Sequence, residues 1–393
     1  MNILVICQYY YPEPFRIRDI CEELVKRGHK VKVITGTPNY PEGVIYKGYE
    51  NNAHMDEIIN GVEVHRCPII PRKTGIVYRF LNYYSYPFFA KKYIKKNTSK
   101  NIKPFDVVFV NQLSPVMMAK PAIYCKKRYN VPIIMYCLDL WPESLIAGGV
   151  SRSSLIYKYY HHVSGKIYRN MDRILITSRM FKKYLKNKFG ISDNKIEYLP
   201  QYAEDLFKPL PFKNEGNVTD LVFAGNIGEI QNVKTIILAA KKMKSEAVRF
   251  HIVGNGTDLK RIQNLAEGLN NVTFYGRRPL EEMQAFYELA DALLVTMKAD
   301  PVLSLTLPGK VQSYMASGKP IIGAINGETA KIIKAAKCGY CGEAENVNEL
   351  VDNIRKFMNN HNKNQLGRNA RLFYEKQFEQ KKFMNRLEAE LNR

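Results

Sequence analysis

Apolar residues along the chain form short continuous runs, and each run is followed by a stretch with helical spacing. Residues 3–7 form the first run, and apolar positions then recur at helical spacing up to Leu24 before a glycine, Gly28. A second run at residues 31–35 completes a strand–helix–strand unit. Continuous apolar strands of this kind are typical of parallel sheets that helices cover on both faces.

The same alternation continues along the chain in two series. Further strand-like runs occur at residues 107–110, 133–138 and 174–177 in the first series, and at 221–224, 250–253, 272–274, 292–296 and 321–324 in the second. The segment between the series, residues 199–211, is rich in proline and has no periodicity, which predicts a linker.

These patterns predict an α/β fold with two doubly wound, parallel-sheet (Rossmann-like) domains that face each other across a cleft. The expected boundaries are residues 1–200 and 201–372. The last amphipathic stretch, residues 365–393, reads as helix, and we expect residues 373–393 to pack back towards the first domain.

Charge is unevenly distributed between these two parts of the chain. The 393 residues carry 59 Lys and Arg against 37 Asp and Glu, and residues 1–200 hold 32 of these basic and 15 of these acidic side chains. The first half therefore has a net charge of +17, which favours polyanions such as nucleic acid, anionic lipid or a phosphorylated substrate.

Two segments of the first half, residues 72–96 and 155–188, mix basic and aromatic side chains. This composition is typical of a surface at a membrane interface, and a nucleic-acid surface uses the same residue types. Core packing and solvated helix faces account for some of these basic and aromatic side chains. Because no helix-turn-helix, zinc-finger or RNA-recognition signature is present, the sequence favours an anionic membrane surface and no nucleic acid.

Other sequence features bear on where the protein resides and on whether it holds disulfides or a metal. No uncharged stretch reaches the ~20 residues of a membrane-spanning helix, and the first residues do not read as a signal peptide. The seven cysteines are scattered, which does not suggest a disulfide framework, and the CxxC at Cys338 and Cys341 has no further metal ligands beside it. We therefore expect a cytoplasmic protein, peripheral to a membrane, with no bound metal.

Three segments could carry chemistry. Gly225-Asn226-Ile227-Gly228 follows a strand and Lys310 opens a helix, so both could hold a phosphate, although a tight turn and a surface lysine are the plain alternatives. Asp139 and Glu143 flank the only tryptophan just past a strand end, where active sites gather in this architecture. Alternatively, Trp141 is a packing anchor and Glu143 caps the next helix.

The chain resembles the GT-B retaining glycosyltransferases of family 4, in the branch typified by N-acetylfucosamine transferases of capsule and O-antigen synthesis. The resemblance runs from residue 1 to about residue 378 and rests chiefly on residues 35–41, 139–144 and 308–320. Residues 253–256 and 271–277 agree more weakly.

This resemblance implies roles for particular residues. Residues 201–372 would bind the nucleotide sugar, and residues 1–200 would bind the acceptor and associate with the membrane. Asp139 and Glu143 would be catalytic, and Phe15, Arg16 and Asn39 would contact the acceptor. The implied donor-binding residues are Gly225, Asn226, Gly228, Gln231, Arg277, Leu307, Lys310 and Ser313.

The chain also departs from the family pattern. Two glutamates that many members carry are replaced by Leu305 and Ser313, and the usual Arg and Lys after the first strand of the second domain are Asn226 and Gln231. Lys310 and backbone amides must then carry more of the phosphate charge. The departures leave open an altered donor geometry or an inactive homologue.

The implied activity is retaining transfer of an N-acetylated amino or deoxyamino hexose from a nucleoside diphosphate donor, with UDP as the family expectation. The implied acceptor is a saccharide linked to polyprenyl diphosphate at the inner face of the plasma membrane, in capsule or O-antigen synthesis. No DxD motif is present, so no cofactor or essential metal is expected. A nucleotide-sugar epimerase of the same fold and a nucleic-acid-binding protein are the alternatives.

Overall fold

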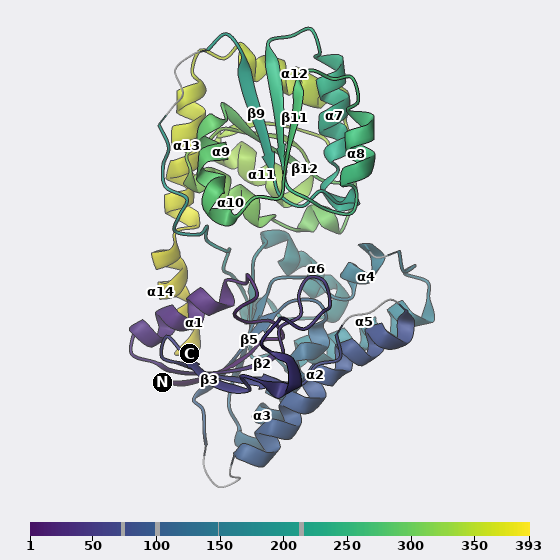
Figure 1. Ribbon diagram of the computed structural model, residues 1–393. Helices are drawn as coiled ribbons and strands as arrows, with labels where there is room; N and C mark the ends of the chain where they lie inside the picture. Colours follow the sequence, from purple (N-terminus) through teal and green to yellow (C-terminus); the bar gives the residue numbers. More distant parts are fainter. Residues whose placement is uncertain (72–74, 99–102, 148, 212–215) are drawn as a thin grey trace. The chain divides into compact units, whose positions relative to one another are not determined.

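The computed structural model describes residues 1–71, 75–98, 103–147, 149–211 and 216–393, which form two compact units (Figure 1). One unit contains Met1–Leu199 and Met384–Arg393, and the other contains Pro200–Phe383. Residues 72–74, which open the first aromatic segment, lie outside the described residues. Each unit is built around one sheet with helices on both faces, which confirms the predicted fold class.

The sheet of the first unit has eight strands in the order β3-β4-β2-β1-β5-β6-β7-β8. Every neighbouring pair is parallel except β3 and β4, which are antiparallel. The direction in which strands are added reverses between β1 and β5, so a topological switch point lies there. The strands are β1 (Asn2–Ile6), β2 (Lys30–Gly36), β3 (Asp56–Ile59), β4 (Val62–Cys67), β5 (Val107–Gln112), β6 (Ile133–Cys137), β7 (Arg173–Ile176) and β8 (Ile196–Tyr198).

Helices α1 and α2 both contact β2 and β4 and lie on opposite faces of this sheet (Figure 1). Local signals fix several helix ends: Gly28 follows α1 with φ +88°, and the Ser154 hydroxyl caps α5 by accepting from the Tyr157 amide. The helices of this unit are α1 (Ile17–Lys26), α2 (Ile76–Asn97), α3 (Lys120–Tyr129), α4 (Glu143–Ala147), α5 (Leu155–Asn170) and α6 (Arg179–Phe189).

The sheet of the second unit has six strands, all parallel, in the order β11-β10-β9-β12-β13-β14. Its switch point lies between β9 and β12. The strands are β9 (Thr219–Ala224), β10 (Val248–Val253), β11 (Val272–Gly276), β12 (Ala292–Thr296), β13 (Ile321–Ala324) and β14 (Gly339–Gly342).

Two apolar clusters, one on each face, pack helices against the second sheet. Phe223 and Ile236 belong to one cluster and Val222 and Tyr314 to the other, because successive strand residues point to opposite faces. Helices α7 (Val233–Lys242), α8 (Leu259–Leu265) and α12 (Val347–Met358) cover one face. Helices α9 (Met283–Leu289), α10 (Gly309–Ala316), α11 (Gly327–Ala336) and α13 (Lys363–Gln377) cover the other.

The final stretch is two helices rather than the single one that its periodicity predicts. Helix α13 ends before Phe378, which is buried in the core of the second unit, and α14 (Gln380–Leu391) follows. From Met384 onward the chain belongs to the first unit, where Glu388 pairs with Arg27 at 3.1 Å and Glu390 with Arg173 at 2.8 Å. Among the described residues, none of the helices combines the length and apolar character that a membrane span requires.

Candidate functional site

The residues predicted to bind the donor lie mainly at the carboxyl edge of the second sheet. Residues 225–228, called here the glycine loop, follow β9, and α10 with Lys310 follows β12. Strands β9 and β12 are neighbours on either side of the switch point, where open α/β sheets bind ligands. The fold thus brings together two segments that are about 80 residues apart in sequence.

The glycine loop packs against the loop after β10 with no room for side chains. The Gly225 amide donates to the Val253 carbonyl and the Ile227 amide to the Asn255 carbonyl, both at 2.9 Å. A Cβ atom on Gly254 would lie 1.8 Å from the Gly225 carbonyl oxygen, and both glycines have φ near +145°. Only glycine fits both positions, so the two loops approach each other backbone to backbone.

Lys310 brings its ammonium group to this loop. A Cβ atom on Gly225 would lie 2.6 Å from the Lys310 Nζ atom, which is 3.8 Å from the centre of the Phe223 ring. Within the described part of the chain, this buried Nζ has no hydrogen-bond partner. Burial lowers the pKa of Lys310 to about 7. A buried cation at a helix N-terminus beside a glycine loop is the arrangement that binds phosphate groups.

Asn226, in the glycine loop, and Gln231, which follows it, form a neutral pair. The Asn226 side-chain amide donates to the Gln231 side-chain oxygen at 3.0 Å, and a Cβ atom on Gly228 would lie 3.0 Å from both groups. These two residues can donate or accept hydrogen bonds, but they add no positive charge. Lys310 is therefore the cation that the structure places against the glycine loop.

Ser313 lies one helical turn beyond Lys310 and contacts a carboxylate that the sequence did not reveal. Its hydroxyl donates to the Glu204 side chain at 3.3 Å and is 3.5 Å from the Gly309 carbonyl oxygen. Glu204 comes from the proline-rich segment, outside every motif, so no local pattern predicts it. A serine and a carboxylate together can bind a vicinal diol such as a ribose.

The remaining two predicted donor residues, Arg277 and Leu307, differ in exposure. Arg277 is exposed just after the edge strand β11, and the Gly254 amide donates to the Gly276 carbonyl at 2.8 Å, so its turn adjoins the loop after β10. The Leu307 side chain is 7% exposed and packs in the apolar cluster on the face of α10. Any contact of Leu307 with a ligand would therefore be through its backbone.

In the first unit, a buried carboxylate joins the loops that carry Phe15 and Asn39. The Glu13 side chain accepts from the backbone amides of Asn39, Tyr40 and Tyr10 at 2.9, 2.8 and 3.2 Å. Burial outweighs these bonds and raises the pKa of Glu13 to about 7. These loops follow β2 and β1 at the carboxyl edge of the first sheet.

Three aromatic rings cluster where these loops meet. Phe15 stacks on Tyr9 with 5.3 Å between ring centroids, and Tyr40 lies 5.0 Å from Phe15. Tyr40 is exposed, whereas the Asn39 side chain is buried and donates to the Thr37 carbonyl. Arg16 is half-buried at the start of α1. The sequence singled out Phe15 and Asn39 but not their aromatic neighbours.

Asp139 lies past the end of β6, near the switch point of the first sheet. It accepts from the Ser114 amide at 3.3 Å, and the Ser114 hydroxyl is 2.7 Å from that of Ser144. Burial raises the pKa of Asp139, while its hydrogen bonds to Ser114 oppose the rise. The carboxylate is half-buried, so it can orient a hydroxyl group of a ligand.

Glu143, the other predicted catalytic residue, is only 1% exposed. It accepts from the hydroxyls of Tyr157 and Tyr184 at 2.9 and 2.7 Å and pairs with Arg152 at 3.0 Å. These donors come from α5, α6 and the segment between α4 and α5. These contacts favour a structural role for Glu143, and they leave Asp139 as the better placed of the two predicted catalytic residues.

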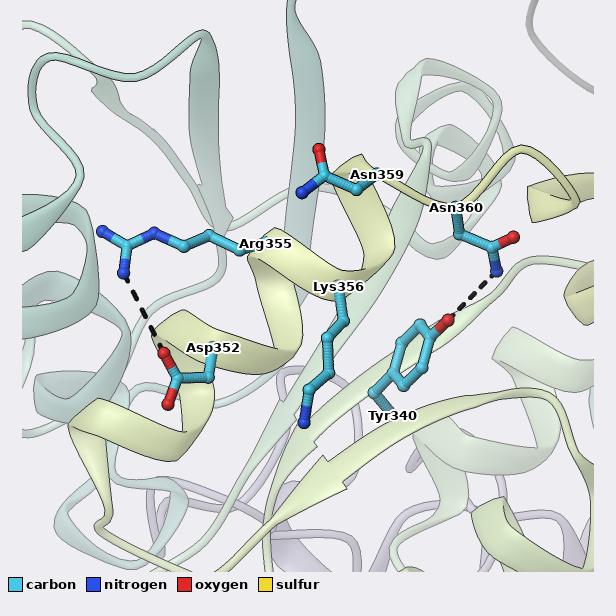
Figure 2. Close-up of a pocket in the computed structure, with 6 residues that line it drawn as sticks. All are labelled: Tyr340, Asp352, Arg355, Lys356, Asn359 and Asn360. Carbon is cyan, nitrogen blue, oxygen red and sulfur yellow. Dashed lines mark hydrogen bonds and ion pairs between the residues drawn. The ribbon is translucent and has the colours of Figure 1, made fainter.

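A surface hollow of about 630 Å³ lies elsewhere on the second unit (Figure 2). Its lining comes from β14, α12 and the residues after α12, and includes none of the predicted site residues. Arg355 in this hollow pairs with Glu246 at 2.8 Å and lies 3.9 Å from Asp352, so its charge is already compensated. The lining residues are Tyr340, Asp352, Arg355, Lys356, Asn359 and Asn360.

Comparisons with known proteins identify the family of this chain. The family described as "Glycosyltransferase Family 4" matches residues 16–201, and "Glycosyl transferases group 1" matches residues 204–373. The putative colanic acid biosynthesis glycosyl transferase WcaI of Escherichia coli K12 is 25% identical over 385 residues, which cover 91% of this chain and 92% of that protein.

Solved structures of glycosyltransferases share the fold over the whole chain. Sucrose-phosphate synthase from Thermosynechococcus elongatus is 17% identical and has a TM-score of 0.74, with 99% of this chain and 97% of that one covered. Alr3699/HepE of Anabaena, in complex with UDP and glucose, is 14% identical with a TM-score of 0.71, covering 100% and 99%. The two family matches adjoin and span almost all of residues 16–373, so this chain belongs to the GT-B glycosyltransferases of the family 4 and group 1 type.

Proposed function

We propose that the protein is a retaining glycosyltransferase that takes its sugar from a nucleoside diphosphate donor, UDP being the expected nucleotide, and acts in the synthesis of a surface polysaccharide. The single observation that carries this proposal is the buried Nζ atom of Lys310 beside the glycine loop, which has no hydrogen-bond partner among the residues that the structure describes. A buried ammonium without a hydrogen-bond partner is costly unless an anion completes its surroundings. A diphosphate supplies that anion.

The relatives support the donor and the pathway. Structures of Anabaena Alr3699/HepE hold UDP and UDP-glucose, and WcaI is named for colanic acid biosynthesis. Another structural neighbour, WaaG, is described as involved in lipopolysaccharide biosynthesis. The sugar we expect is an N-acetylated amino or deoxyamino hexose.

In the proposed reaction, the bond between C1 of the sugar and the diphosphate oxygen breaks, the acceptor hydroxyl oxygen bonds to C1 from the same face, and the hydroxyl proton passes to the departing diphosphate. Negative charge develops on the leaving nucleoside diphosphate. Lys310 and the amides at the N-terminus of α10 stabilise that charge, so the proposal needs no metal ion. Ser313 and Glu204 bind the ribose, and Asp139 orients the reacting groups.

We assign acceptor binding to the first unit. The aromatic rings of Phe15 and Tyr40 and the loop of Asn39 lie at the carboxyl edge of its sheet, together with Arg16. Aromatic rings offer apolar faces on which sugar rings pack. The acceptor proposed is a saccharide on polyprenyl diphosphate, because the net charge of +17 on residues 1–200 favours an anionic, membrane-bound substrate. We therefore propose that the protein acts at the inner face of the plasma membrane.

The test is transfer from radiolabelled UDP-sugars to polyprenyl-diphosphate-linked saccharides in detergent. We expect label from one UDP-sugar to enter the lipid extract, with one UDP released per sugar transferred, and with the anomeric configuration retained in NMR spectra of the product. Lys310→Ala should reduce the rate about 100-fold or more. Conversion of the UDP-sugar to an isomer without acceptor would instead identify an epimerase, and binding of DNA without any turnover would refute the proposal.

A further inference from the structure

Exposed apolar side chains gather on two helices of the first unit. The described residues include fourteen large apolar side chains that are exposed, and eight of them belong to α2 and α5. Leu155 is 82% exposed, Val77 69% and Phe88 64%. The eight residues are Val77, Tyr78, Phe80, Leu81 and Phe88 on α2, and Leu155, Ile156 and Tyr159 on α5.

These side chains form one continuous surface, called here the α2–α5 face. Residues 77, 80, 81, 84 and 88 follow helical spacing along one side of α2. The Phe80 and Tyr84 rings are 4.6 Å apart, and the Tyr84 hydroxyl is 3.2 Å from that of Tyr159 on α5. The N-terminal halves of the two helices therefore lie side by side at Tyr84 and Tyr159.

The two helices that form this face carry charge of a single sign. Residues 64–105 and 144–171 contain no aspartate or glutamate, so neither helix carries an acidic side chain. On α2 the basic residues are Arg79, Lys91, Lys92, Lys95 and Lys96, and on α5 they are Lys158, Lys166 and Arg169. The Lys120 Nζ atom lies 4.4 Å from the centre of the Tyr84 ring.

We propose that the α2–α5 face is the surface by which the protein docks on a bilayer that contains anionic phospholipid. Its apolar and aromatic side chains insert among the lipid headgroups, while the surrounding lysines and arginines contact the lipid phosphates. The proposal rests on the proposed function in one respect: a lipid-linked acceptor requires the enzyme to reach the membrane.

The contacts behind this face lead to the loop that carries Asp139, a predicted catalytic residue. The Tyr83 ring packs edge-on against Trp141 at 5.4 Å, and Trp141 also meets Tyr160 of α5 at 5.7 Å. Trp141 lies two residues after Asp139 and is 2% exposed. One layer of side chains thus separates the docking face from the loop of Asp139, so docking would bring a membrane-bound acceptor close to that loop.

The experiment is sedimentation of the full-length protein with phosphatidylcholine vesicles that contain 0 or 30% phosphatidylglycerol, over a salt series. The test variant carries Val77→Ser, Phe80→Ser and Leu155→Ser, and the matched control carries Val44→Ser, Ile58→Ser and Leu372→Ser, which are equally exposed apolar residues elsewhere. Thermal stabilisation by UDP is measured for each protein, so that folding and donor binding are checked separately.

We expect wild type and control to bind anionic vesicles, the test variant to bind at least tenfold more weakly, and salt to weaken wild-type binding without abolishing it. Equal binding by the test variant, or absence of vesicle binding by the wild type, overturns the docking proposal. Vesicle binding that disappears in salt together with equally strong DNA binding overturns it in favour of a polyanion surface. Vesicle binding without UDP stabilisation would refute the transferase proposal and leave the docking face intact.

Discussion

The Nζ atom of Lys310 occupies the space beside Gly225 that a side chain would need, 2.6 Å from the position of a Cβ atom there. Gly225 also has φ +146°, which L side chains rarely adopt. Because Gly225 has no side chain, it leaves room for the ammonium group of Lys310, which extends from the start of α10. The two form the phosphate-binding centre of the proposed donor site.

Gly225→Ala should weaken UDP binding at least tenfold, because the new methyl group strains the backbone and displaces the Lys310 ammonium. Isothermal titration calorimetry measures this effect. Gly268→Ala is the matched control: Gly268 also has positive φ, +75°, but a Cβ atom there would contact nothing within 4 Å. If both substitutions change UDP affinity equally, backbone strain and not the Lys310 contact is the cause.

Donor binding should take up a proton above pH 7. With a pKa of about 7 in the free protein, Lys310 is mostly neutral at pH 8 and mostly charged at pH 6. A bound diphosphate raises that pKa, so binding a UDP-sugar takes up nearly one proton at pH 8 and almost none at pH 6. Calorimetry at pH 8 in buffers of different ionisation enthalpy measures this uptake.

Lys310→Arg provides the control for this titration, because arginine stays charged at both pH values. This variant should bind with the same enthalpy in every buffer. An unchanged wild-type enthalpy across buffers at pH 8 would mean that Lys310 is already charged in the free protein.

Glu204→Gln should reduce the affinity for UDP about fivefold and for a 2′,3′-dideoxy analogue hardly at all, because the lost hydrogen bond is to the ribose. Ser313→Ala should act in the same direction, and the two effects should be non-additive since the side chains are 3.3 Å apart. Equal losses for both nucleotides would show that Glu204 supports the site without touching ribose.

Substitution of Asp139 should mainly affect catalysis, and substitution of Glu143 should mainly affect stability. Asp139→Asn should lower kcat about 100-fold while UDP stabilisation and the melting temperature stay near those of wild type. Glu143→Ala should instead destabilise the protein by about 1–3 kcal/mol for each buried hydroxyl that loses its acceptor. Thermal unfolding with and without UDP, together with steady-state kinetics, distinguishes the two; a stable, inactive Glu143→Ala enzyme would restore a catalytic role to Glu143.

The central strands could be predicted from sequence because each is a continuous apolar run, and β12 and β13 occupy the predicted residues 292–296 and 321–324. Four outer strands were not predicted. Strands β3, β8 and β14 have sequences DEII, IEY and GYCG, and β4 (VEVHRC) has three polar residues among its six. Their pairing therefore depends on the neighbouring strand rather than on local hydrophobicity.

Some site residues could likewise be predicted from a local sequence signal, and others could not. Gly225 and Lys310 could be predicted because glycine and a helix-opening lysine carry local signals. Glu204 could not, since its contact with Ser313 spans 109 residues and arises only when the segment after the first domain lies against α10. The burial of Glu143 beneath two tyrosines likewise depends on the packing of α5 and α6.

The central claim, that Lys310 and the glycine loop hold the diphosphate of the donor, is tested most directly by calorimetric titration of UDP at pH 6.5 into wild type, Lys310→Ala and the control Lys331→Ala. Lys331 is exposed on α11, so its replacement removes the same charge outside the site. Wild type and Lys331→Ala should bind UDP equally, and Lys310→Ala at least tenfold more weakly, a loss of about 1.4 kcal/mol or more. Absence of UDP binding by the wild type, or equal affinity in all three proteins, would contradict the claim.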